Sequence, residues 1–226
     1  MKPNSINVIT IDGTSGSGKT TISRLLAKQL RYSLLDSGKL YRSAGYILSK
    51  NNQSLTNPSN ISQLISCIEL KTNPNTFEYE IYYKKNKIDH LLYDEIAGRN
   101  ASIVSKIPRV RECMLKIQHS CLQGPGLIAN GRDMGTEVFP DAVLKLYINA
   151  SIEIRAKRRY NELIEKGQSI NFEDVLNSLS DRDESDINRT ISPLKIPDNA
   201  EIIDTSELKP DAIVDKILNL YTITKN

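Results

Sequence analysis

The strongest constraint on this 226-residue chain is a glycine-rich segment, residues 13–20, that directly follows the apolar run Val8–Ile11. The segment matches G-x-x-x-x-G-K-[ST], a pattern in which a tight loop turns backbone N–H groups toward phosphate oxygens. The β-branched run before it is typical of a buried strand, and residues 21–30 have apolar side chains at helical spacing. Strand, loop and helix in this order predict a nucleoside triphosphate site at the positive end of the helix.

Two side chains of this loop have separate expected tasks. The Lys19 ammonium is expected to contact the β- and γ-phosphates, and the Thr20 hydroxyl is expected to bind Mg²⁺. The residues predicted to surround the triphosphate are Gly13, Thr14, Ser15, Gly16, Ser17, Gly18, Lys19, Thr20 and Thr21.

Five short apolar runs predict the strands of one parallel sheet, and helical spacing predicts the segments between them. The strands are expected at residues 8–11, 33–36, 127–129, 142–148 and 200–204, and the helices at about 21–30, 39–49, 108–121, 151–166, 171–180 and 210–220. Alternation of strands with helices favours an α/β fold with right-handed crossovers.

Residues 69–90 have a different character from the rest of the chain. The alternating aromatic run Glu78–Tyr83 predicts antiparallel strands, and Lys84–Lys87 predicts a hairpin turn. The preceding residues 51–60 are rich in turn-forming side chains. We therefore expect a small β insertion outside the parallel core.

Composition limits the class of protein. A net charge of +3 gives no argument for a nucleic-acid partner. The three cysteines, Cys67, Cys113 and Cys121, form no metal-binding or disulfide pattern, which favours reduced thiols in a cytoplasm. The polar residues 1–7 suggest no signal peptide, and no apolar run reaches membrane-spanning length. We expect a cytoplasmic monomer that binds neither nucleic acid nor membrane.

Polar residues follow three of the predicted strands. They are the loop at residues 13–20, Asp36-Ser37 and Gly131-Arg132-Asp133. Because ligands of an open α/β sheet bind beyond the carboxyl ends of its strands, these residues are expected to line one site.

Several motifs together carry a resemblance to a known family. They are Leu35–Arg42, Pro108–Arg111, Gly131–Pro140 and Asp186–Arg189. With them the chain resembles the bacterial cytidylate kinases over essentially its whole length. The resemblance implies the P-loop nucleoside monophosphate kinase fold, with a five-stranded parallel core flanked by helices, a monophosphate-binding insertion and a lid. It also implies transfer of phosphate from ATP to CMP and dCMP with Mg²⁺.

The resemblance implies a division of the chain and a set of site residues. The core is expected at residues 1–36, 105–150 and 190–226, the monophosphate-binding domain with its β-rich insertion at 37–104, and the lid with its flanking helices at 151–189. The expected catalytic residues are Lys19, Arg132, Asp133 and Arg158, and the expected substrate contacts are Ser37, Arg42, Ser102, Arg111, Arg132, Asp133, Arg182, Asp186 and Arg189.

Chemistry favours some of these roles independently. A monophosphate acceptor is already ionised, so the reaction needs positioning and cancellation of charge rather than a general base. The positive groups available are Lys19, Arg42, Arg132, Arg189 and the lid arginines Arg155, Arg158 and Arg159.

Cytosine presents an amino donor beside two acceptors. Asp133 and Ser102 have oxygens that can accept from N4, and Arg111 can donate to N3 and O2. The resemblance implies that these positions bind the base. By the resemblance, Arg182 and Asp186 lie near the sugar.

The chain also departs from the pattern of the family. Asn130 stands where many members have Asp, so we assign it no metal, and Ser185 and Ile187 replace common arginines. An AMP or UMP kinase is the nearest alternative. A regulatory GTPase is a second one, because Asn86–Asp89 matches N-K-x-D. That match lies in a predicted hairpin turn and no D-x-x-G accompanies it, so we interpret it as chance.

Overall fold

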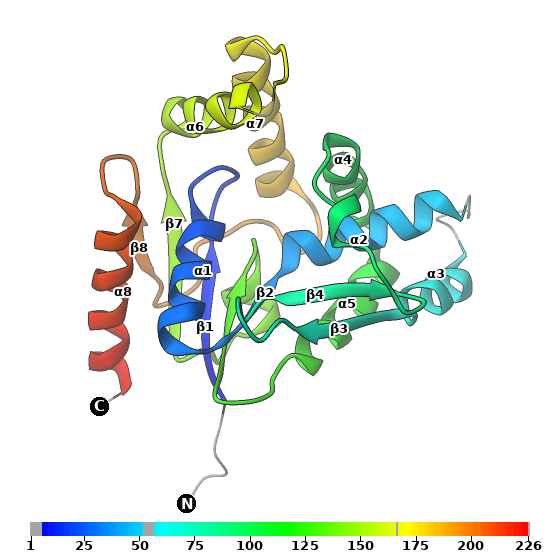
Figure 1. The fold of residues 1–226 in the computed structure, drawn as a ribbon, viewed down its shortest axis with the longest axis horizontal. Helices are drawn as coiled ribbons and strands as arrows, with labels where there is room; N and C mark the ends of the chain where they lie inside the picture. Colours follow the sequence, from blue (N-terminus) through cyan, green and yellow to red (C-terminus); the bar gives the residue numbers. More distant parts are fainter. Residues whose placement is uncertain (1–5, 52–56, 166, 226) are drawn as a thin grey trace, which may run out of the picture. The chain divides into compact units, whose positions relative to one another are not determined.

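The computed structural model describes residues 6–51, 57–165 and 167–225 (Figure 1). Three of the sequence predictions extend beyond these residues: part of the polar start (1–5), part of the turn-rich segment (52–56), and Lys166 at the end of a predicted helix.

Five strands form a parallel sheet in the order β2-β6-β1-β7-β8, which confirms the predicted fold class. The strands are β1 (Asn7–Asp12), β2 (Ser33–Asp36), β6 (Gly126–Asn130), β7 (Leu144–Asn149) and β8 (Glu201–Asp204). Each lies within two residues of its expected range. β1 and β8 both pair with β7 in parallel, with Ile11 opposite Leu146 and Ile148 opposite Ile203.

Helices connect and flank these strands. They are α1 (Lys19–Leu30), α2 (Ser37–Lys50), α3 (Pro58–Ile65), α4 (Glu95–Val104), α5 (Pro108–Ser120), α6 (Ile152–Glu165), α7 (Phe172–Asn188) and α8 (Pro210–Lys225), with short turns η1 (Asp89–Leu91) and η2 (Met134–Val138). The sequence prediction missed α3, α4 and η2. It also ended α7 too early, because residues 181–188 are polar apart from Ile187 and so show no helical spacing of apolar side chains.

The chain divides into two compact units. Unit 1 comprises residues 1–7 and 27–129, and unit 2 comprises residues 8–26 and 130–226. The division into core, monophosphate-binding domain and lid stays a prediction.

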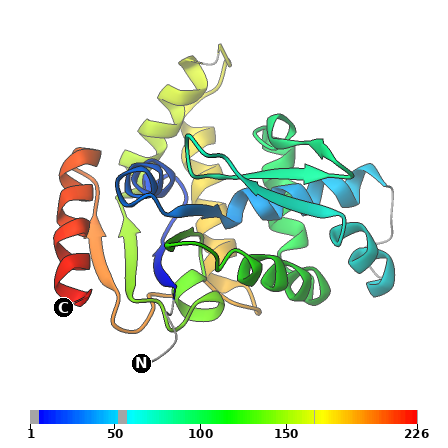
Figure 2. The same cartoon turned by 60° about the horizontal axis from the view of Figure 1, so that its bottom comes forward.

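Unit 2 contains β1, β7 and β8, with the loop of residues 13–18 before α1. Ile9 and Ile11 of β1 are fully buried, as are Leu146 and Ile148 of β7. Figure 2 shows β8 between β7 and α8. Burial of these apolar side chains stabilises the region that carries the loop.

Helices α6 and α7 of the same unit pack on each other (Figure 1). Their shared apolar cluster contains Ala156, Leu163, Val175 and Leu179. The rings of Tyr160 and Phe172 meet edge to face, with 5.9 Å between centroids. Aromatic pairs of this geometry add to the energy of area burial, so the two helices form one packed arm.

Unit 1 contains a second, antiparallel sheet in the order β3-β4-β5, which confirms the predicted β insertion. Its strands are β3 (Ile68–Thr72), β4 (Tyr79–Tyr83) and β5 (Asn86–Lys87). Lys84 and Lys85 form the turn between β4 and β5, with φ of 48° and 69°. Two positive φ values in a two-residue hairpin loop are those of a type I′ turn, which follows the twist of the strands.

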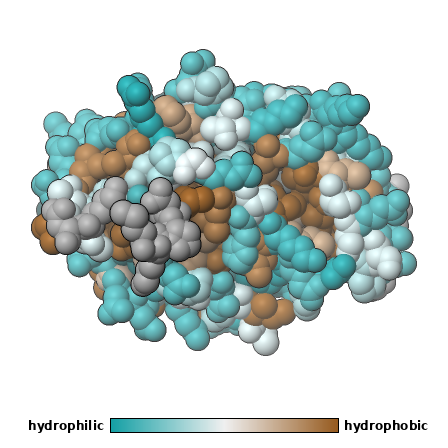
Figure 3. All heavy atoms as spheres, turned by 90° about the horizontal axis from the view of Figure 1, so that it is seen from below, coloured by the Kyte–Doolittle hydropathy of each residue, from teal (hydrophilic) through white to brown (hydrophobic). Residues whose placement is uncertain are grey.

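The surface is mixed in character. Figure 3 shows one face on which hydrophobic residues lie among hydrophilic ones. None of the helices in the described residues is long and apolar enough to cross a membrane. The cysteines Cys67, Cys113 and Cys121 are free thiols.

Replacement of Lys85 by Gly is expected to stabilise the protein by about 1 kcal/mol, because the left-handed conformation costs a side-chain-bearing residue about that much. Urea unfolding of Lys85→Gly and of wild type measures the difference. Lys87→Gly, in the neighbouring strand, is the control and should destabilise. Equal stability of Lys85→Gly and wild type would contradict the turn assignment.

Candidate active site

The loop of residues 13–18 leaves β1 in close contact with β7. A Cβ on Gly13 would lie 1.9 Å from the carbonyl oxygen of Ile148, and its φ of 141° lies outside the usual range of other residues. Only glycine fits there without displacing the β7 backbone. The contact fixes the point at which the loop begins.

Side chains from the ends of β7 and β8 hold the loop further along. The Thr14 hydroxyl donates to Asn149 Oδ1 over 2.9 Å, and the hydroxyl of Thr205 donates to the carbonyl oxygen of Ser17, also over 2.9 Å. Sequence reasoning missed Asn149 and Thr205. The rule that ligand sites lie at the carboxyl ends of strands could have found both, because each stands at or directly after a strand end.

Lys19 lies inside the loop. Its Nζ donates to the carbonyl oxygen of Thr14 and, over 3.3 Å, to the hydroxyl of Ser17, and the residue is 6 % exposed. The ammonium therefore lies beside the Thr14 carbonyl and the Ser17 hydroxyl. It is at the start of α1, where backbone N–H groups have no intrahelical partners. A group bound there would meet a positive charge and aligned N–H donors.

Two of the arginines expected in the lid, both in unit 2, also approach the loop. Arg158 on α6 donates to the carbonyl oxygen of Thr205 over 2.5 Å and to its hydroxyl over 3.2 Å. Its guanidinium lies 3.9 Å from the position that a Cβ on Gly18 would take. Arg155 is buried against residues 15 and 183, whereas Arg159 lies on the outer face of α6 with Glu162, at 2.9 Å. Of the three expected lid arginines, Arg158 has the clearest position for a phosphate contact.

The segment after β6 brings two arginine–carboxylate pairs together. Arg132 Nε lies 2.7 Å from Asp186 Oδ2, and Arg189 Nη2 lies 3.5 Å from Asp133 Oδ2. Asp133 and Arg189 have side chains that are only 4 % and 7 % exposed. The structure thus brings together four of the residues predicted from sequence. Arg182, the fifth residue expected in this region, lies partly buried on α7.

Asp12, the residue before Gly13, holds this segment in place. Its two carboxylate oxygens accept from the backbone N–H groups of Met134 and Gly135 over 2.8 and 2.7 Å. Burial raises the pKa of Asp12 from 3.8 to about 6 against the effect of these hydrogen bonds. Sequence reasoning assigned no role to Asp12, and nothing in the loop motif itself points to one.

Asn130, at the end of β6, lies near the position expected to bind metal. Its Nδ2 donates to the Thr20 hydroxyl over 3.4 Å, and the residue is buried. The amide is neutral, so the Thr20 oxygen remains beside a dipole instead of a carboxylate.

The predicted substrate residues of unit 1 have partners within that unit. Gln118 Nε2 on α5 donates to the Ser37 hydroxyl over 2.9 Å, and both residues are buried. Arg42 on α2 donates to the carbonyl oxygens of Leu92 and Asp94, over 2.9 and 3.3 Å.

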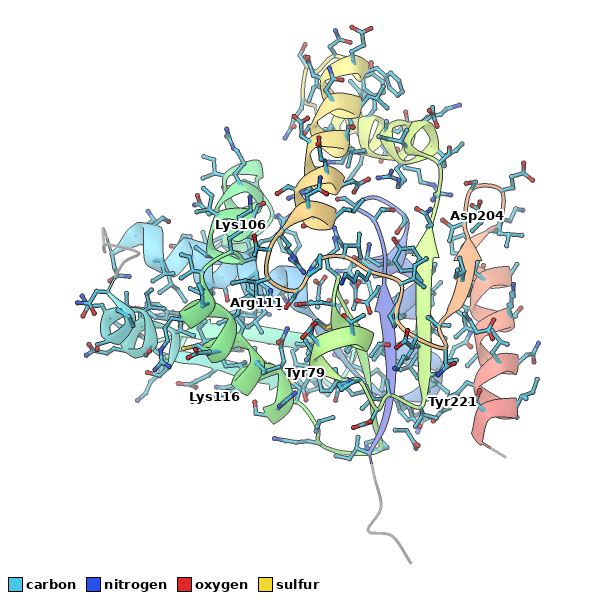
Figure 4. The ribbon with its side chains drawn as sticks, turned by 180° about the vertical axis from the view of Figure 1, so that it is seen from behind. Tyr79, Lys106, Arg111, Lys116, Asp204 and Tyr221 are labelled. Carbon is cyan, nitrogen blue, oxygen red and sulfur yellow. The ribbon has the colours of Figure 1, made fainter. Side chains whose placement is uncertain are left out.

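The other two expected contacts of unit 1 lie on α4 and α5. Arg111 on α5, labelled in Figure 4, lies over the ring of Tyr41 at 5.8 Å from its centroid. Ser102 lies on α4. The role of each toward a substrate stays a prediction.

The fold and the loop define a P-loop kinase, in which a phosphate-binding loop joins a parallel strand to a helix and arginines lie nearby. A family model described as cytidylate kinase matches residues 9–223. The chain belongs to the cytidylate kinase family.

Similar proteins agree with this assignment. The chain is 41 % identical over 214 residues to a cytidylate kinase of Azotobacter vinelandii (94 % of this chain, 93 % of that one) and 42 % identical to one of Shewanella oneidensis with the same coverage. It is 37 % identical to one of Aeromonas salmonicida (96 % of this chain, 94 % of that one). A solved structure of an uncharacterized protein from Eubacterium ventriosum has a TM-score of 0.51 at 12 % identity, covers 96 % of this chain and 98 % of its own, and shows the fold alone.

The raised pKa of Asp12 predicts a pH dependence of stability. The unfolded carboxyl titrates near pH 4 and the folded one near pH 6. Between these values the folded state holds the extra proton, so the contribution of Asp12 falls as pH rises and is constant above about 6. Relative to Asp12→Asn, the free energy of unfolding of the wild type should fall by about 3 kcal/mol across this window. Urea unfolding from pH 4 to pH 7 measures it.

Asp204, at the end of β8 and labelled in Figure 4, is the matched control. Hydrogen bonds from Ser206 lower its pKa, so the contribution of Asp204 is lost only as pH falls below 4. The difference between wild type and Asp204→Asn should therefore change little from pH 4 to pH 7. A difference between wild type and Asp12→Asn that stays constant or rises from pH 4 to 6 would show that burial does not govern this carboxyl.

Proposed function

We propose that this protein is a cytidylate kinase that transfers the γ-phosphoryl group of ATP to CMP and dCMP, giving CDP and dCDP. Membership of a kinase family implies ATP as a substrate. The observation that carries the proposal is the segment after β6, where Asp133 and Arg132 lie with Arg189 and Asp186 in the unit that holds the phosphate-binding loop.

The proposed roles follow from charge. ATP and a monophosphate together bring about five or six negative charges, and phosphoryl transfer needs these to be cancelled and aligned. Lys19 would hold the β- and γ-phosphates, and Arg158 and Arg132 would balance the charge of the transferred group. No side chain has to remove a proton from the ionised acceptor.

Mg²⁺ suits the oxygen groups near the start of α1. Thr20 is an exposed residue on the first turn of α1, and oxygen atoms are the ligands that Mg²⁺ prefers. When bound together with the triphosphate, the ion neutralises phosphate charge. Thr20 would be its protein ligand, and Asn130 would orient the hydroxyl through the hydrogen bond at 3.4 Å.

The GTPase alternative has little support. Asn86 and Lys87 form β5 of the antiparallel sheet. The Asp89 carboxylate accepts from the backbone N–H of Ile81 over 2.9 Å and pairs with Lys39. The N-K-x-D residues therefore stabilise the hairpin, and the carboxylate expected to read guanine is already bonded.

A coupled assay of ADP release tests the function. Full-length protein with ATP is supplied with CMP, dCMP, UMP or AMP in turn. Turnover should be highest with CMP and dCMP. Faster turnover with AMP or UMP would assign the protein to another nucleoside monophosphate kinase.

Lys19→Ala should reduce kcat to less than about a tenth of the wild-type value, because one electrostatic contact to the charge of the transition state contributes about 3 kcal/mol. Circular dichroism and thermal unfolding check that the fold is retained. The control is Lys28→Ala, further along α1, which should leave the rate unchanged. If Lys19→Ala retained a rate near that of the control, Lys19 would not contact the phosphates in the transition state.

Asp133→Asn should change the choice of base. An amide can turn its NH₂ toward O4 of uracil, whereas the carboxylate accepts from N4 of cytosine. We expect kcat/KM for CMP to fall by about 1–3 kcal/mol and that for UMP to fall less or to rise. Steady-state kinetics with both substrates give the ratio.

The control for this variant is Asp186→Asn, which disturbs the other arginine–carboxylate pair. It should lower kcat/KM for CMP and for UMP by the same factor. If Asp133 only anchors Arg189, then Asp133→Asn will also leave the CMP-to-UMP ratio unchanged.

A further inference from the structure

The apex of the phosphate-binding loop is held by an ion pair from α6 and α7. The backbone N–H of Ser15 donates to Asp183 Oδ1 over 3.2 Å, and Arg155 Nη1 donates to the carbonyl oxygen of Ser15 over 3.0 Å. The same Arg155 nitrogen lies 2.5 Å from Asp183 Oδ2. Both backbone groups of one loop residue are thus bonded by one arginine–carboxylate pair.

The pair is buried and further fixed by the chain around it. Arg155 is 5 % exposed and Asp183 7 % exposed, and Arg155 Nε donates to the carbonyl oxygen of Ala150 over 2.9 Å. Buried charges are costly unless they are paired and hydrogen-bonded, so this geometry has few alternatives. Gly16, the next loop residue, lies against the pair, because a Cβ there would be 3.3 Å from Arg155 Cβ.

The position of the pair separates Ser15 from the other loop residues. The N–H and the carbonyl group of Ser15 face α6 and α7. The N–H groups of the following residues, from Gly16 to Thr20, are therefore the ones that can turn toward phosphate. Small displacements of such groups are expensive, since misplacement by about 1 Å can cost a hundredfold in rate.

We propose that Arg155 and Asp183 are positioning residues for phosphoryl transfer, which set the conformation of the phosphate-binding loop through Ser15. This inference rests on the proposed function. It gives Arg155 a task different from the direct phosphate contact expected of a lid arginine. It also couples the packed arm of α6 and α7 to the loop, since the arm can leave the loop only if the bonds to Ser15 break.

The test needs a variant that removes both charges without leaving one buried alone. Arg155→Met leaves the Asp183 carboxylate buried without its ion-pair partner, and Asp183→Asn does the same to the Arg155 guanidinium. Each variant should therefore have a lower melting temperature than wild type. The double variant Arg155→Met/Asp183→Leu replaces the pair by apolar side chains, an exchange that often preserves stability. It therefore separates positioning of the loop from stability of the fold.

Four quantities measured on the protein distinguish positioning of the loop from stability of the fold. We expect the double variant to recover most of the lost melting temperature and yet to show a KM for ATP raised about tenfold or more, with the KM for CMP within about twofold of wild type. Hydrogen exchange of the segment 13–20 should be faster than in wild type. Glu162→Gln, which neutralises the partner of Arg159 on the exposed face of α6, is the matched control and should change none of these values.

A double variant with both a recovered melting temperature and a wild-type KM for ATP would assign the pair to stability alone and overturn the proposal.

A direct measurement of ATP binding by calorimetry keeps this test apart from the proposed function. If the wild type binds ATP but phosphorylates neither CMP nor dCMP, the proposed function fails. The weaker ATP binding and faster exchange expected of the double variant would still support the positioning role, and wild-type values of both would reject it.

Discussion

At Gly13, directly after β1, the backbone passes so close to β7 that the start of the loop is fixed in one position. The Ile148 carbonyl oxygen occupies the space that any Cβ would need. From this point Asn149 and Thr205 bond Thr14 and Ser17 of the loop, and Asp183 and Arg155 bond its apex. A loop with no regular hydrogen-bond ladder thereby obtains a defined shape from four elements around it. Preorganised N–H donors are useful because they do not have to be reoriented when charge develops.

Three arginines of unit 2, Arg132, Arg155 and Arg189, share a second constraint, since a carboxylate holds each of them. Asp183 and Asp186 lie three residues apart on α7, so both project from one face of the helix. They pair with Arg155 and Arg132, and Asp133 pairs with Arg189. A paired guanidinium keeps a fixed orientation and remains charged. An incoming phosphate would therefore meet arginines that are already placed, and it would compete with carboxylates for them.

Local patterns predicted the five core strands, the loop and the β insertion, because each has a short-range signal of apolar alternation or glycine spacing. The same patterns could not predict η2, which depends on Asp12 accepting two backbone N–H groups from residues more than 120 positions away. The partners of the arginines were hidden for a similar reason. The sequence places Asp133 beside Arg132, yet the ion pairs join each to a residue near the end of α7. Tertiary packing, which sequence spacing does not contain, decides between such neighbours.

The departures from the family pattern that are expected at residues 185 and 187 can be interpreted in the same physical terms. Ile187 is 51 % exposed on α7, and Ser185 is partly buried on the same helix. An arginine at an exposed position would act on the site through water, where opposite charges attract by only about 1 kcal/mol at 4 Å and salt weakens them further. The pair formed by Arg132 and Asp186 has partly buried side chains and is screened much less. An arginine in place of Ile187 would therefore change the long-range field of α7 far more than it would change the groups expected to hold the substrate.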